Sequence, residues 1–346
     1  VGVVGERTLA ARGGGVVLGG VAADHAGDVL ALRAGPGGVA FTGPVNLGPG
    51  ALLLESAGEV TQAHGIVAGG LALLGEGGSY RLTHSGNAVA ALAANTGSLH
   101  YEQGPSLTIG SIAGVDGITV ADRFLVRLHD HSAKLTVAEG VSAGGSGHAV
   151  VLVAGGIVNE AGATPFDVPN GAFLIYSLAP SLNELGEFTS PGNLFGRTYD
   201  GDGPQALRDE FGDALGSRMI YAVRPTLYIV ADDQSRVYGD ANPELTYQVL
   251  GLVDGDSPET ALAGALTTAA TQGSGVGTHA ITEDPDDPFR SAIGYEVRVI
   301  VGMLAVTPRP ITVVADSLSK VYGDADPALT YTIAAGELVE GDALTG

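Results

Sequence analysis

Short apolar runs separated by glycine-containing turns dominate the first half of the chain. Typical runs are Ala51–Leu54, Leu71–Leu74 and Val150–Val153, each four residues long and without a 3.6-residue period. Short apolar runs between turns are typical of buried β-strands, whereas an amphipathic helix needs a longer periodic pattern. The pattern therefore predicts an all-β structure.

These runs also recur at nearly equal steps of 21, 20, 19 and 19 residues, with strands predicted to begin at Val39, Val60, Tyr80, Leu99 and Ile118. A hairpin meander could give short strands too. A near-constant repeat of small residues favours a parallel β-helix, in which each turn pairs with the turns above and below it. We predict a right-handed parallel β-helix, a solenoid, over residues 1–180.

The regular spacing stops after Ser177, where Pro180, Pro191 and Pro204 appear together with the charged stretch Arg208–Asp213. Proline cannot donate a hydrogen bond to a neighbouring strand and restricts the residue before it. Residues 181–224 are therefore predicted to form an irregular connector or cap.

A literal repeat follows. The stretch Val237–Tyr247 returns 84 positions later as Val321–Tyr331, and each copy is preceded by an alternating apolar run and followed by a Gly-Asp pair. Pro308 and Pro310 end the strand before the second copy. We predict a first small β-sandwich-like module over residues 225–307 and a partial second module over 308–346.

The second copy would extend to about position 391 by the same offset, so the chain looks like a piece of something longer. We expect its strands to lack partners, because unpaired strand edges seek other strands. Residues 310–346 are thus expected to be poorly ordered, or ordered by a neighbouring copy or a longer chain.

Composition and charge exclude several classes of function. Lys and Arg number 16 against 38 Asp and Glu, and the net charge of −22 disfavours nucleic acid as a partner. The absence of cysteine excludes disulfides, thiolate metal sites and cysteine nucleophiles. No apolar run approaches the roughly 18 residues of a membrane span.

Four segments are candidate metal sites. His129 and His131 alternate with a buried strand, so that both would lie on one face of it, and a His-x-His pair can bind zinc or copper. Asp200 and Asp202 lie in an oxygen-rich loop that could bind calcium, as could Asp284–Pro288 and the Asp232–Asp233 step. The competing interpretation is a solvent-facing strand and ordinary turns, so no metal or cofactor is expected.

The repeated Tyr-Gly-Asp motif is interpreted as architecture. Its glycine permits a positive φ, its aspartate side chain can close a turn, and its proline sets the start of the next strand. The motif residues are Tyr238, Gly239, Asp240 and Pro243, then Tyr322, Gly323, Asp324 and Pro327. Its tyrosines, with Tyr247 and Tyr331, are expected to pack as module core; stacking on a carbohydrate is the alternative.

No catalytic constellation is evident. The glycine-rich stretches lack the Lys-Ser/Thr of a phosphate-binding loop, and Asp, Lys and Arg do not cluster at the spacing of the turns. We expect the chain not to be an enzyme. A polysaccharide-processing β-helix remains an alternative.

The chain resembles the C-terminal shaft of filamentous haemagglutinin-like bacterial adhesins followed by MBG domains. The segments that carry the resemblance are Gly69–Gly75, Leu92–Ser98, Leu107–Gly110 and Asn170–Ser177, together with the Tyr-Gly-Asp motifs. Adhesins of this family usually have Arg-Trp before the leucine of the segment Asn170–Ser177, where this chain has Ala172-Phe173.

The resemblance implies a fibre that is secreted or displayed on the bacterial surface through a two-partner or related type V route. Adhesion or biofilm cohesion is the implied activity. The implied partners are a surface glycan or protein of the host or of bacteria, neighbouring copies in the fibre, and an outer-membrane secretion protein. A passive stalk that displays a binding domain outside this segment is a further alternative.

Overall fold

The computed structural model describes residues 7–11, 15–22, 28–201, 203–212 and 215–345. The chain divides into two compact units. The first comprises Val1–Arg224 with Val253–Asp256, and the second comprises Pro225–Leu252 with Ser257–Gly346.

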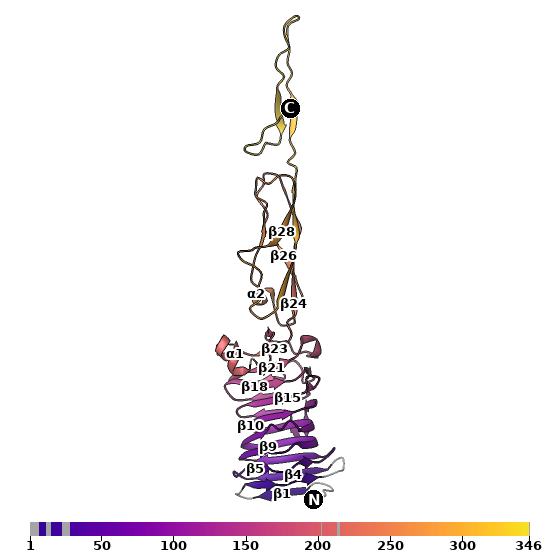
Figure 1. Cartoon of the computed structure of the whole chain (residues 1–346), viewed down its shortest axis with the longest axis vertical. Coiled ribbons are helices and arrows are strands. Elements are labelled where there is room, and N and C mark those ends of the chain that lie inside the picture. The colour runs from indigo at the N-terminus through magenta and orange to yellow at the C-terminus, as the bar shows by residue number, and fades with distance from the viewer. Residues whose placement is uncertain (1–6, 12–14, 23–27, 202, 213–214, 346) are drawn as a thin grey trace. The chain divides into compact units, whose positions relative to one another are not determined.

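The first unit is a β-helix of about nine turns, whose parallel strands stack from the indigo end to the magenta part of Figure 1. The early turns contain β1 (Arg7–Ala11), β2 (Val16–Leu18), β3 (Val21–Ala22), β4 (Val29–Ala34), β5 (Val39–Phe41), β6 (Val45–Asn46), β7 (Ala51–Ser56), β8 (Glu59–Gln62), β9 (Ile66–Leu82) and β10 (Ala88–Gln103). The later turns contain β11 (Leu107–Ile109), β14 (Ile118–Val120), β15 (Phe124–Leu128), β16 (Lys134–Val137), β17 (Val141–Ala143), β18 (Gly147–Val153), β19 (Gly156–Asn159), β20 (Phe166–Asp167) and β21 (Gly171–Ser177). The predicted parallel β-helix is confirmed.

Four of the five predicted strand starts form one column of this coil. Val39 pairs with Val60, Val60 with Tyr80, and Tyr80 with Leu99. All four side chains are at most 3% exposed and fill the interior. The spacing of 19 to 21 residues is therefore the length of one turn in this part of the coil.

The fifth predicted start, Ile118, does not continue that column. Leu99 pairs with Phe124 instead, and Ile118 pairs with Ala94 on another side of the coil. The reason is an inserted hairpin of β12 (Ser111–Ile112) and β13 (Val115–Asp116), which lengthens this turn. Ile112 of the hairpin covers Ala72 and Ala93 on the outer surface, which explains why these outward alanines are buried.

The stretch predicted to be an irregular connector contributes a further turn to the coil. It contains the short 3-10 helix η1 (Pro180–Leu182), β22 (Asn193–Phe195), α1 (Pro204–Phe211) and β23 (Arg218–Tyr221). The strand β23 pairs in parallel with both β21 and β22. Rings of Phe166, Phe173 and Phe188 pack together near this end, with centroids 4.9 to 6.0 Å apart.

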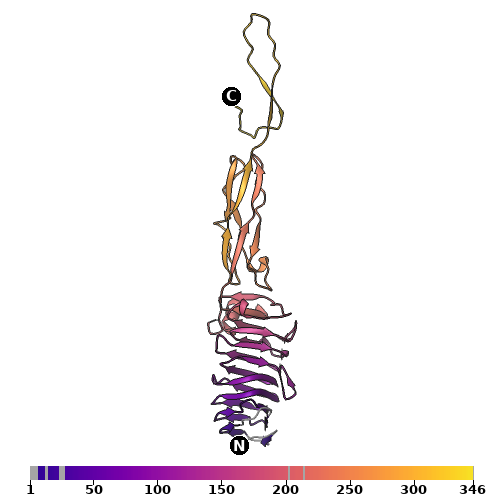
Figure 2. The same cartoon turned by 90° about the vertical axis from the view of Figure 1, so that its right-hand side faces the viewer.

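The second unit begins with a small two-sheet module (Figure 2). Its core joins Ala231 of one sheet to Ile281 and Leu304 of the other. One sheet has the order β26 (Tyr247–Leu250), β24 (Thr226–Ala231), β29 (Glu296–Ile300), and the other β25 (Gln234–Val237), β30 (Gly302–Thr307), β28 (Gly277–Glu283), β27 (Leu266–Thr268), with α2 (Pro258–Ala261) between strands. The predicted sandwich-like module is confirmed.

The partial second copy forms one antiparallel pair, β31 (Thr312–Ala315) and β32 (Tyr331–Ala335). These strands correspond to β24 and β26 of the first copy. The strand β24 has β29 on its other edge, whereas among the described residues neither β31 nor β32 pairs with a third strand. Their side chains are accordingly mostly exposed.

None of the described helices is both long and apolar enough to cross a membrane.

Candidate functional site

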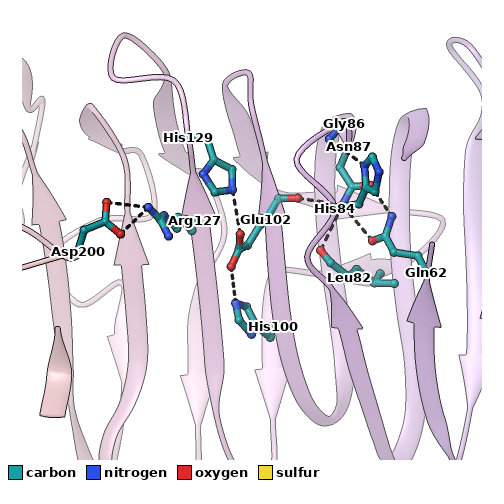
Figure 3. Close-up of polar contacts among 10 residues, drawn as sticks. All are labelled: Gln62, Leu82, His84, Gly86, Asn87, His100, Glu102, Arg127, His129 and Asp200. Atoms are coloured by element: carbon teal, nitrogen blue, oxygen red, sulfur yellow. Dashed lines mark hydrogen bonds and ion pairs between the residues drawn. The ribbon is translucent and has the colours of Figure 1, made fainter. Parts of the chain in front are cut away.

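A row of polar side chains runs across several turns of the coil (Figure 3). Near one end of the row lies Asn87, which is 1% exposed. Its Oδ1 accepts hydrogen bonds from the Ile66 amide and the Gln62 side chain, both at 2.8 Å, and its Nδ2 donates to the carbonyl oxygen of Glu102 at 2.8 Å. One buried amide thereby links three successive turns.

The next member of the row is Glu102 on β10, whose carboxylate lies between two imidazoles (Figure 3). Its Oε1 is 2.9 Å from Nε2 of His100, and its Oε2 is 2.8 Å from Nε2 of His129. The Glu102 side chain is 16% exposed, and the two histidines are about one-third exposed. Since a carboxylate can only accept, each imidazole donates through Nε2.

Arg127 lies beside this group, on β15, and holds a segment of the chain 73 positions away. Its Nη2 donates to both carboxylate oxygens of Asp200, at 2.7 and 2.8 Å. The guanidinium carbon lies 5.2 Å from the ring centroid of Tyr199, which packs edge-on against Tyr176 at 5.4 Å. Burial raises the pKa of Tyr199, Arg127 opposes this shift, and the carboxylates of Glu102 and Asp200 add to it.

These groups border a hollow of about 230 Å³. Leu128, Val153 and Leu178 line it together with Tyr176 and Tyr199, and Arg127, Arg197, His129 and Thr198 add polar groups. Pockets for drug-sized ligands usually span roughly 300–1,000 Å³, so this hollow suits one small ring. A second hollow, of about 460 Å³, is bordered by Arg123, His148, Asn170 and Arg208.

Three of the four candidate metal ligands line the smaller hollow, although they come from two separate motifs: His129, His131 and Asp200. The strand ends at Leu128, however, so His129 and His131 do not share a strand face. His131 follows Asp130, which accepts hydrogen bonds from the amide and hydroxyl of Ser132; these bonds lower the pKa of Asp130. Asp202 lies outside the described residues.

A metal role for these residues gains no support from their geometry. Within the described ranges, no three histidine, aspartate or glutamate side chains are placed to share a metal ion. Asp200 is already bound by Arg127, and His129 by Glu102.

The other predicted calcium loops use their carboxylates locally. Asp284 accepts from the amide of Asp286 at 2.9 Å, and Asp287 accepts from Arg290 at 3.0 Å. Asp232 accepts from the Thr246 hydroxyl at 2.7 Å. These are the contacts of turns and strand ends.

The Tyr-Gly-Asp motif adopts the same turn in both copies. Gly239 and Gly323 have φ values of +85° and +90°, so the predicted positive φ is confirmed. The prediction that the aspartate side chain closes the turn is wrong. The backbone amides of Asp240 and Asp324 close it, by donating to the carbonyl oxygens three residues before them at 3.1 and 3.2 Å.

The proline of each motif does not directly start a strand: β26 and β32 begin four residues after Pro243 and Pro327.

The motif tyrosines are not core residues, which corrects a further prediction. Tyr322 is fully exposed. Tyr247 and Tyr331, which lie outside the turn, are 38% and 53% exposed. Tyr238 is half-buried, and its hydroxyl donates to Asp342 at 3.1 Å, a hydrogen bond that raises the pKa of Tyr238.

The polar row itself was not apparent from the sequence. One signal was available: His100 and Glu102 are two positions apart, so they share a face of one strand. Placing His129 beside them requires the register of Leu99 with Phe124, which depends on the inserted hairpin. Asp200 approaches Arg127 only through the fold of the last turn.

Comparison with known proteins adds one match, at the C-terminal part of the chain. Residues 227–296 and 311–346 match the model of the MBG domain (YGX type). Both repeats are similar to the MBG domain. The matched ranges contain the two Tyr-Gly-Asp motifs, so the repeat predicted from the sequence is confirmed as an MBG-like pair. No curated protein and no solved structure matches the chain.

Proposed function

We propose that this chain is a structural, adhesive segment of a secreted bacterial surface fibre, with no catalytic role. The observation that carries the proposal is the architecture: a β-helix whose turns stack in register, in the same chain as MBG-like modules. In such a coil each turn contacts its neighbours in sequence, which suits a long, mechanically continuous shaft.

The proposed route is export by a two-partner or related type V system, with an outer-membrane secretion protein as a transient partner and the bacterial surface as the destination. Two properties of the chain support it. There is no cysteine, so no disulfide has to form after the chain crosses a membrane unfolded. Turns of a solenoid can also fold one upon another as they emerge.

The proposed ligand-contacting part is the hollow beside Tyr199. Its Arg127 is neutralised by Asp200, and its Arg197 by Glu210 at 2.5 Å, so no large excess of charge selects an ion. Apolar walls with aromatic rings and a few hydrogen-bonding groups suit a neutral sugar ring. We therefore assign a neutral glycan unit as the ligand, in preference to a surface protein or a neighbouring copy.

Binding of the full chain to bacterial and host cells, and to immobilised neutral and acidic glycans, tests the adhesive role. Tyr199→Ala and Arg127→Ala should reduce neutral-glycan binding at least tenfold. Arg33→Ala is the matched control, because Arg33 forms an exposed ion pair with Glu55 elsewhere on the coil and should leave binding unchanged.

Two other results would replace this proposal. Chain that binds neither cells nor glycans would be a passive stalk. Turnover of a polysaccharide by the purified chain, lost on substitution of residues at either hollow, would identify a β-helix enzyme.

A further inference from the structure

The second unit contains a specific contact between the two copies of the repeat. The Tyr238 hydroxyl of the first copy donates to Asp342 of the second at 3.1 Å. Beside it, Gly239 packs so closely on Val339 that a Cβ at this glycine would overlap the valine side chain. The Tyr-Gly-Asp turn of one copy therefore receives a loop of the next.

That loop is itself repeated. Leu338–Asp342 reads Leu-Val-Glu-Gly-Asp, and Leu252–Asp256 reads Leu-Val-Asp-Gly-Asp. The two have the same backbone: φ is +91° at Gly255 and +92° at Gly341, and in each the last amide donates to the valine carbonyl, at 3.1 and 3.0 Å. We call this segment the Gly-Asp loop.

A second contact comes from the arginine that precedes each copy. Arg309 donates through Nε to the carbonyl oxygen of Tyr238 at 2.7 Å, and through Nη2 to the carboxylate of Asp240. Arg309 and Pro310 precede β31 as Arg224 and Pro225 precede β24. The second copy thus contacts the first copy's turn at two points.

The Gly-Asp loop of the first copy and the arginine that precedes that copy also form contacts, and these contacts lie within the first unit. The carbonyl oxygen of Asp254 accepts from the Asn193 side chain at 3.0 Å, and Gly255 packs against the carbonyl of Ser190. Arg224 packs over Gly196. Both copies therefore use the Gly-Asp loop and the leading arginine as contact points.

The turn of the second copy has the same backbone but an open surface. Tyr322 is fully exposed, and among the described residues no atom outside the turn lies within 4 Å of the position a Cβ would occupy at Gly323. We propose that the Tyr322–Asp324 turn is a docking site for a further module of this type. Its Gly-Asp loop would accept from the Tyr322 hydroxyl, and its leading arginine would bind Asp324.

The proposal concerns a module-to-module joint, and it stands or falls independently of adhesion. Its test compares the 346-residue chain with an extended chain, in which residues 1–346 are followed by a second copy of residues 261–307 and then of 308–346. The first addition completes the second module, and the next supplies the leading arginine and Gly-Asp loop of a third.

Hydroxyl-radical footprinting with mass spectrometry then reports the exposure of each tyrosine. In the 346-residue chain Tyr322 should oxidise several-fold faster than Tyr238. In the extended chain its rate should fall to about that of Tyr238. A control extension, in which the added copies of Arg309 and Asp342 are both alanine, should leave Tyr322 reactive. Equal reactivity of Tyr322 in the 346-residue and extended chains would overturn the proposal.

A cross-link tests the contact between Gly239 and Val339 in the 346-residue chain. The chain has no cysteine, so Gly239→Cys with Val339→Cys introduces a single possible disulfide. A Cβ at Gly239 would lie 3.3 Å from that of Val339, close to the roughly 3.5–4.5 Å of disulfides. Oxidation should give a faster-migrating species on non-reducing gels. A pair of Gly239→Cys with Leu329→Cys should not. If the chain with Gly239→Cys and Val339→Cys forms no disulfide, the contact on which the proposal is based does not exist.

Discussion

Glycine at the bends of the coil is required by close backbone approach as well as by φ. Gly75 and Gly77 both have positive φ, +120° and +78°. A Cβ at Gly75 would overlap the carbonyl of Ser56 on the preceding turn. Within the described part of the chain, no atom beyond the adjacent residues lies within 4 Å of a Cβ at Gly77. The two positions therefore separate backbone strain from steric overlap.

We expect Gly77→Ala to destabilise the coil by about 1 kcal/mol, the cost of a positive φ, and Gly75→Ala by about 3 kcal/mol because overlap is added. Urea unfolding followed by circular dichroism measures both. Equal losses of stability would show that the turns can separate locally to admit the methyl group.

Buried tyrosines give the coil a defined response to alkaline pH. Burial raises the pKa of Tyr221 to about 12, and raises the pKa of Tyr80 and Tyr101 further. An unfolded tyrosine ionises near pH 10. Because the folded pKa is the higher one, the stabilisation is complete below pH 10 and is lost as pH rises from about 10 to 12.

Absorbance at 295 nm should therefore show that these three tyrosines ionise only when the coil unfolds. Tyr221→Phe should weaken the fall in stability between pH 10 and 12. Ionisation of all tyrosines near pH 10 in the folded chain would contradict the expectation.

At the scale of strands, corresponding elements of the two repeats differ in their partners. Ile229 and Val230 lie on β24, which is paired on both edges, while Val313 and Val314 lie on β31, which is paired with β32. Protection from hydrogen exchange depends on how much structure must open to release an amide.

We expect amides of β31 and β32 to exchange at least a hundredfold faster than those of β24 and β26 in monomeric chain. Mass-spectrometric hydrogen exchange compares the four strands in one sample. Full protection of Ile311–Ala315 and Leu329–Ile333 in a monomer would show that a two-stranded sheet is stable by itself.

The strands of the coil were predictable where one turn resembles the next. The column from Val39 to Leu99 follows from equal spacing and buried side chains. The column then shifts because a hairpin was inserted, and its residues have the same apolar, glycine-rich pattern as the strands around them. Sequence spacing cannot distinguish an extra excursion from the next strand.

The candidate site was harder to predict for the same reason. His129 and Asp200 stood out as polar residues beside strands, yet their partners depend on register and on the path of the last turn. Glu102 contacts His129, which is 27 positions away, and Arg127 contacts Asp200, which is 73 positions away. Such contacts are set by tertiary packing, which local patterns do not encode.

At the scale of the whole chain, the two compact units have separate cores. The coil depends on contacts between turns, such as those of Asn87, which joins three of them. The second unit depends on the two-sheet module, in which Asn242 accepts from Arg236 at 2.7 Å and donates to the carbonyl of Ala270 at 2.6 Å. Units with independent cores unfold as separate cooperative transitions.

Differential scanning calorimetry of the full chain should therefore show two transitions. Asn87→Ala leaves the Ile66 amide and the Glu102 carbonyl without their partner. It should lower the free energy of unfolding of the first unit by about 2–3 kcal/mol and leave the transition of the second unit unchanged. Asn242→Ala should do the reverse, because its partners all lie in the second unit. The two asparagines are matched controls for each other. A single transition that both substitutions lower by similar amounts would mean that the coil and the module unfold as one cooperative body.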